Sequence, residues 1–103
     1  MKALWVLAFC TPDFVLPDDL ETIEDNAFEG AAMTAVEISG DCEYIGAEAF
    51  KNCKNLTRIY VPEYCQLGEN VFEGCVLVYV FGTEDSPAQD YCDEYENCVF
   101  VEY

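Results

Sequence analysis

The chain repeats itself every 22 residues, and this period constrains its fold more than any other feature of the sequence. A dipeptide of one apolar residue and one phenylalanine recurs at Ala27-Phe28, Ala49-Phe50 and Val71-Phe72. A fixed period of this length is typical of a solenoid, in which each unit stacks only on its neighbours. Because a solenoid presents an extended surface, we expect no concave pocket.

Each period contains a short stretch of alternating character, which indicates a β-strand with one inward face. The four stretches are residues 14–17, 36–39, 59–62 and 80–82. We expect their first and third residues to face the core: Phe14 and Leu16, Val36 and Ile38, Ile59 and Val61. We expect their second residues to face outward: Val15, Glu37, Tyr60 and Phe81. After each of the first three strands, a turn leads to a second inward residue: Ile23, Ile45 or Leu67.

The segment that ends in each phenylalanine is long enough for one helical turn and no more. Coils that stack at the strand spacing of about 4.8 Å would bring Phe28, Phe50 and Phe72 into a ladder of rings through the core. Gly30 and Gly74 then permit the reversal toward the next strand, because glycine adopts left-handed conformations at little cost.

The pattern changes after residue 82, which predicts a separate C-terminal cap over residues 83–103. Ser86 is a suitable helix N-cap, and Pro87 is a suitable first helical residue. Apolar residues at positions 88, 91, 92 and 95 form one helical face, and residues 98–101 read as a last strand. A cap of this kind covers the core that the last coil would otherwise expose. We therefore expect one domain, with repeats at 14–82 and a cap at 83–103.

Residues 1–13 have two interpretations. Met1-Lys2, followed by apolar residues at 3–9, is similar to a short secretion signal that would be clipped from the chain. The alternative is a degenerate first strand that caps the solenoid.

The repeated text resembles the BspA-like leucine-rich repeats. It reads LPDDLETIEDNAFEG, then YIGAEAFKNCKNLTRIYVP, then LGENVFEGC, and VFGTEDSPAQDYCDEYENCVFV is similar to the module that often closes such arrays. The resemblance covers about residues 14 to 101 in roughly three repeats. It implies an α/β fold: a short right-handed leucine-rich-repeat solenoid with stacked parallel strands, one-turn helices and a helix–strand cap. It also implies a secreted or cell-surface protein, usually bacterial, that functions in adhesion or binds host or matrix proteins.

Composition excludes several classes of function. The chain has 4 Lys+Arg against 21 Asp+Glu, a net charge of -17, which disfavours nucleic acid as a partner. It has no histidine, so the commonest general base and nucleophile pairs are missing. No nucleotide-binding or calcium-loop motif occurs, and no apolar run is long enough for a transmembrane helix. We expect a protein without catalytic residues, cofactor or metal.

Seven cysteines are present, an odd number. Cys53 and Cys75 share one repeat position, and we expect both to be free, buried thiols. Cys42 and Cys65 occupy roughly equivalent turns, and Cys92 and Cys98 flank the end of the cap helix. For each of these two pairs, the sequence leaves both a disulfide and free thiols open.

The candidate binding site is the exposed strand face. Its residues are Val15, Glu37, Arg58, Tyr60, Tyr79 and Phe81. Aromatic and arginine side chains are the usual anchors of protein interfaces. Two alternatives stay open. In the first, Tyr and Val are present on this face only because they favour β-strands, and the face binds nothing. In the second, the chain is a structural spacer or capping subunit of a larger repeat assembly with no ligand of its own. The oligomeric state is not determined by the sequence.

Overall fold

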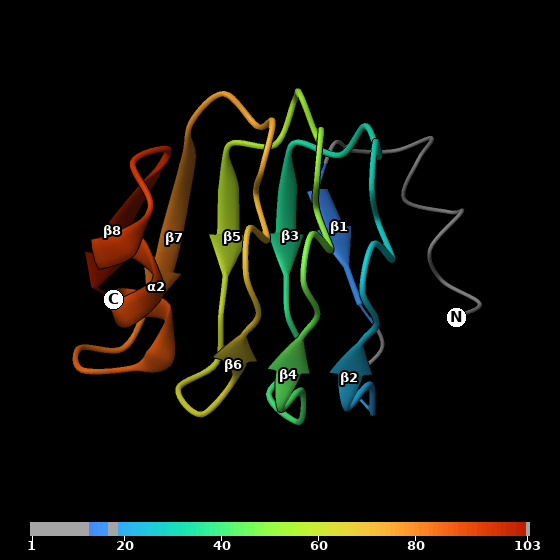
Figure 1. The fold of residues 1–103 in the computed structure, drawn as a ribbon. Coiled ribbons are helices and arrows are strands. Elements are labelled where there is room, and N and C mark those ends of the chain that lie inside the picture. Colours follow the sequence, from blue (N-terminus) through green and yellow to red (C-terminus); the bar gives the residue numbers. More distant parts are fainter. Residues whose placement is uncertain (1–12, 17–18, 103) are drawn as a thin grey trace.

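The strands of the repeat stack in parallel into two sheets (Figure 1). The computed structural model describes residues 13–16 and 19–102, with the side chains of 13–15 excluded. The long sheet has the order β1 (Asp13–Val15), β3 (Ala35–Glu37), β5 (Arg58–Tyr60), β7 (Val78–Gly82) and β8 (Cys98–Glu102). The short sheet has the order β2 (Thr22–Ile23), β4 (Tyr44–Ile45) and β6 (Gln66–Leu67). Each of the first three coils thus contributes one strand to each sheet, whereas β7 and β8 extend the long sheet alone.

The predicted inward residues form the core of the described part of the chain. Leu16, Val36, Ile38, Ile59 and Val61 are all buried, as expected. The prediction for the Phe14 side chain lies outside the described residues. Both interpretations of residues 1–13 also stay untested, because residues 1–12 lie outside that part of the chain. The sequence missed the short sheet, because two-residue strands are too brief to show alternation.

The segments around the phenylalanines are hydrogen-bonded turns, so the expectation of one-turn helices was wrong in this detail. The reason is a left-handed residue within each turn: φ is 59° at Asn26, 57° at Glu48 and 54° at Asn70. A right-handed helical turn cannot continue through such a residue. The reversals predicted at Gly30 and Gly74 are confirmed, with φ of 75° and 82°.

The phenylalanine ladder is confirmed. The rings of Phe28 and Phe50 are stacked with centroids 5.4 Å apart, and those of Phe50 and Phe72 with centroids 5.9 Å apart. Backbone hydrogen bonds join the same turns, since the N–H of Phe28 donates to the Ala49 carbonyl and that of Phe50 to the Val71 carbonyl. Each coil therefore supports the next through both its ring and its backbone.

All six described cysteines are free thiols. Cys53 and Cys75 are buried, as predicted, and each thiol donates to a carbonyl of the preceding coil, Phe28 O and Phe50 O, at 3.2 Å. The Sγ atoms of Cys42 and Cys65 lie 3.9 Å apart in the core. These contacts give the cysteines a packing role, in which the thiol also satisfies a buried carbonyl.

The cap contains the helix α2 (Pro87–Glu94), which begins where the sequence predicted. Ser86 is its N-cap and accepts a hydrogen bond from the backbone N–H of Gln89. The helix packs against β6, β7 and β8 at the end of the solenoid (Figure 1). The edge of the Tyr91 ring meets Phe72, with centroids 5.7 Å apart, and so extends the ladder by one aromatic ring.

Side chains of the cap replace the hydrogen bonds that a further coil would provide. Within the array, the N–H groups of Phe28 and Phe50 donate to carbonyls of the next coil; at the last coil, the N–H of Phe72 donates to the Tyr91 hydroxyl at 3.3 Å. The amide Nδ2 of Asn97 donates to the Phe72 carbonyl at 2.8 Å, the bond that a cysteine thiol makes in the inner coils. The cap therefore closes the backbone of the array as well as its core.

Candidate functional site

The register of the long sheet aligns the predicted site residues in two rows. One row holds Val15, Glu37, Tyr60, Phe81 and Val101. The other holds Asp13, Ala35, Arg58, Tyr79 and Val99. We call these two rows the strand face. The backbone of Val15 lies in the first row, whereas the prediction for its side chain lies outside the described residues.

The strand face is an open surface with a mixed composition. Glu37 and Arg58 are exposed, Tyr79 is 42% exposed, and Tyr60 and Phe81 are half-buried. Tyr60 and Phe81 stack on each other with ring centroids 4.8 Å apart and an interplanar angle of 20°. Because each ring limits the motion of the other, this pair is a preorganised aromatic surface.

The structure adds two residues that the sequence did not assign to the face. Strand β8 pairs with β7, which places Val99 beside Tyr79 and Val101 beside Phe81. Val99 is 40% exposed and Val101 is half-buried, so both extend the apolar area. The sequence predicted a last strand at residues 98–101 but carried no signal that this strand joins the same sheet.

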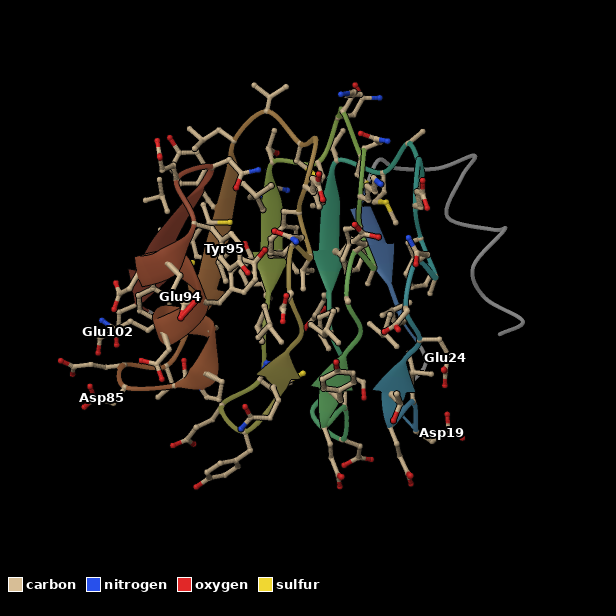
Figure 2. All side chains as sticks on the ribbon, in the orientation of Figure 1. Asp19, Glu24, Asp85, Glu94, Tyr95 and Glu102 are labelled. Carbon is tan, nitrogen blue, oxygen red and sulfur yellow. The ribbon has the colours of Figure 1, made fainter. Side chains whose placement is uncertain are left out.

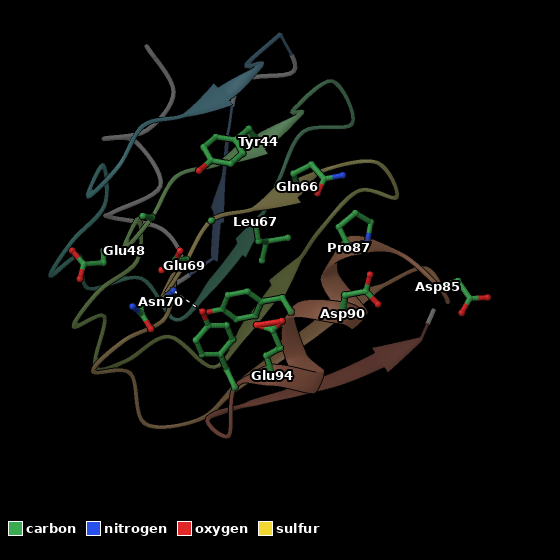
Figure 3. A pocket seen from close by; sticks show the side chains of 14 residues that line it. Tyr44, Glu48, Gln66, Leu67, Glu69, Asn70, Asp85, Pro87, Asp90 and Glu94 are labelled. Atoms are coloured by element: carbon green, nitrogen blue, oxygen red, sulfur yellow. Dashed lines mark hydrogen bonds between the residues drawn. The ribbon is translucent and has the colours of Figure 1, made fainter.

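The structure also contradicts the expectation of a surface without a pocket. A groove of about 1080 Å³ lies between β6 and the helix α2 (Figure 3). We call it the cap groove. It is lined by Tyr44, Leu67, Asp90, Tyr91, Glu94 and Tyr95, among others. The groove forms because the short sheet stops at β6 while the long sheet continues to β7 and β8.

Among the described residues, no group of three Asp, Glu or Cys side chains is arranged to hold a metal ion. Nor does any helix in that part of the chain have both the length and the apolarity needed to cross a membrane.

Comparison with known families agrees with this architecture. The model of the BspA type leucine-rich repeat region matches residues 8–98 in six copies. The chain belongs to the BspA-type leucine-rich repeat family. The family model divides the chain into more copies than the three that the 22-residue period indicated, while the fold is the one expected. Searches of curated proteins and of solved structures gave no match.

Membership in this family indicates a general kind of function. BspA-type repeats are often involved in protein–protein interaction or adhesion, and their solenoids are generally binding scaffolds without enzymatic activity. Proteins of the family are typically secreted or located at the cell surface.

Proposed function

We propose that this chain is a non-enzymatic, secreted or cell-surface module that binds a protein partner, of host or matrix origin, through the strand face. The observation that carries the proposal is the stacked pair of Tyr60 and Phe81, which are neighbours in the first row of the strand face. Interface anchors are enriched in tyrosine and arginine, and aromatic rings contribute large contact areas at low entropic cost. Tyr79 and Arg58 provide such groups in the second row.

The residues of the strand face also vary from coil to coil, whereas the residues at the repeated core positions remain apolar. The repeated phenylalanines and cysteines lie in the core, and changing them would affect stability before binding. The outward residues Glu37, Tyr60 and Phe81 occupy one register position yet differ in charge and size. Specificity can therefore reside there without cost to the fold.

A pull-down from cell-surface and matrix extracts, with mass spectrometry as the readout, tests the proposal. The double variant Tyr60→Ser/Phe81→Ser should lose capture of the partner that the unchanged chain enriches. Because these rings are half-buried, Arg58→Glu at an exposed position provides a second variant that reverses one charge. The matched control is Tyr64→Ser/Val76→Ser, since these residues are 81% and 75% exposed and lie outside the two rows. Equal capture by all four proteins would reject the strand face.

A second candidate function is that of a spacer or capping subunit of a larger repeat assembly. It is favoured by the cap, whose Tyr91 and Asn97 occupy the hydrogen-bonding groups that another coil would need. Analytical ultracentrifugation at increasing protein concentration discriminates between the two functions. Self-association would support the structural role, whereas a monomer at all concentrations would count against it.

A further inference from the structure

The cap groove has an apolar floor whose rings are held in place. Tyr91 and Tyr95 stack with centroids 4.2 Å apart. Their hydroxyl groups accept hydrogen bonds from the backbone N–H groups of Phe72 and Asn70, both at 3.3 Å. Leu67 and Tyr44 line the groove from the short sheet. The floor is therefore preorganised and does not have to rearrange when a ligand binds.

Carboxylates surround this floor. Glu48 and Glu69 lie on the side of the repeat turns, and Asp85, Asp90 and Glu94 lie on the side of the cap (Figure 3). No lysine or arginine is among the described residues that line the groove. A groove with aromatic rings below and only negative charge around it is complementary to cations that also present a flat or apolar surface.

The spacing of the carboxylates favours an extended ligand over a single ion. Within the described part of the chain, no three of them converge as metal ligands do. An arginine side chain matches both features of the groove, because its planar guanidinium stacks on aromatic rings and pairs with carboxylates in a bidentate manner. Individual exposed ion pairs contribute little, so binding requires several cations along one segment.

A second copy of this chain cannot provide such a segment. The sequence has 4 Lys+Arg in total, and Arg58 is the sole arginine. A segment of a different protein is therefore the occupant that fits this pattern of charge.

We propose that the cap groove binds an extended, arginine-rich segment of a partner protein. This site is separate from the strand face, because none of the residues that line the groove belongs to either row of that face. A negative result for the cap groove would therefore leave the function proposed for the strand face unaffected, and the reverse also holds.

Acidic side chains also occur elsewhere on the surface, so the test needs a control for general attraction. Figure 2 shows Asp19 and Glu24 at one end of the solenoid and Asp85, Glu94 and Glu102 at the cap end. The probe is a fluorescent peptide of alternating arginine and serine, and its binding to the full chain is measured by anisotropy at several salt concentrations. A peptide with lysine in place of arginine reports the contribution of guanidinium stacking.

The decisive comparison uses two double variants in and just after one helix. Asp90→Asn/Glu94→Gln removes two charges from the groove, and Asp93→Asn/Glu96→Gln removes two exposed charges that do not line it. We expect the groove variant to weaken binding of the arginine peptide about tenfold and the control less than about twofold. We also expect Tyr60→Ser/Phe81→Ser to leave peptide binding unchanged. Equal losses in the two charge variants, or no measurable binding to the unchanged chain, would overturn the proposal.

A measurement on the unchanged chain does not depend on how the variants fold. In a titration followed by two-dimensional NMR, the amide signals of Leu67, Gly68 and Asn70 should shift on addition of the arginine peptide, while that of Tyr79 on the strand face should not. Shifts spread evenly over both surfaces would contradict a site in the groove.

Discussion

At the scale of single residues, the ladder of aromatic rings carries much of the packing. Phe50 is fully buried and has a ring on each side, at 5.4 Å and 5.9 Å. Phe28 is half-buried, with one stacked ring neighbour among the described residues. The two residues occupy one repeat position, yet they differ in burial and therefore in their contribution to stability.

We predict that Phe50→Ala lowers the free energy of unfolding by about 3–5 kcal/mol, because it leaves a cavity in the centre of the ladder. Phe28→Ala should cost roughly 1–3 kcal/mol, since part of that ring is already exposed to water. Urea denaturation of both variants measures the two values. Equal losses would show that the ladder does not pack as a continuous column.

Burial also changes the acidity of one thiol. The core around Cys65, together with the neighbouring thiol of Cys42, raises the pKa of Cys65 above its ordinary value. In the unfolded chain a cysteine ionises near pH 8.5, at about its ordinary pKa. Below that pH both states keep the proton; above it the unfolded state releases the proton while the folded state retains it. The free energy of unfolding should therefore fall as the pH rises above this value.

We predict that this alkaline loss is smaller in Cys65→Ala. Between about pH 8.5 and pH 10.5, the slope of unfolding free energy against pH should be less steep than in the unchanged protein by roughly 1.4 kcal/mol per pH unit, the effect of one proton. Denaturation curves recorded across this range provide the slopes, and the range from pH 6 to 8 serves as the control, where the slopes should agree. Identical slopes above pH 9 would mean that Cys65 ionises in the folded protein as easily as in the unfolded one.

At the scale of elements, the cap closes the array by side-chain hydrogen bonds. The Tyr91 hydroxyl accepts from a buried N–H at Phe72, whereas the Tyr95 hydroxyl accepts from the N–H of Asn70, which is exposed. Both bonds are 3.3 Å long, so the difference between them is access to water. Burial also raises the pKa of Tyr91, in keeping with a neutral hydroxyl in the core.

We predict that Tyr91→Phe costs about 1–3 kcal/mol, because the N–H of Phe72 loses its acceptor in a site that water does not reach. Tyr95→Phe removes the same group, but water can replace it, so the expected cost is below about 1 kcal/mol. Thermal unfolding of the two variants gives the comparison. A larger loss for Tyr95→Phe would contradict the role assigned to the cap.

Some features of the helices, strands and turns could be predicted from the sequence, and others could not. The repeat predicted the inward residues and the ring ladder, and the Ser86-Pro87 pair beyond it predicted the start of α2, because each depends on local pattern or on simple stacking. The sequence did not predict the short sheet, because two-residue strands are too brief to show alternation. Nor did it predict the left-handed conformation of Glu48, because glutamate, unlike Asn26 and Asn70 at the equivalent positions, is not a residue that favours that conformation. The cap groove was missed for a different reason: it arises where two sheets end at different coils, which is a property of the tertiary structure.

At the scale of the whole molecule, residues that recur with the 22-residue period and residues that do not have different structural roles. The repeated ones hold the coils together, and the non-repeated ones form the strand face and the walls of the cap groove. Of the predicted site, the structure orders Glu37, Tyr60 and Phe81 in one row and Arg58 and Tyr79 in the next. The partner that we propose for this face would be selected by its shape and charge, which no sequence motif encodes.

Site-specific photocrosslinking is the most direct measurement of where a partner binds. A benzoylphenylalanine at position 79, in the second row of the strand face, should form an adduct with the partner captured from surface and matrix extracts. The same group at position 64, where the native tyrosine is 81% exposed but lies outside the two rows, should form none. Adducts at position 64 without adducts at position 79 would contradict binding through the strand face.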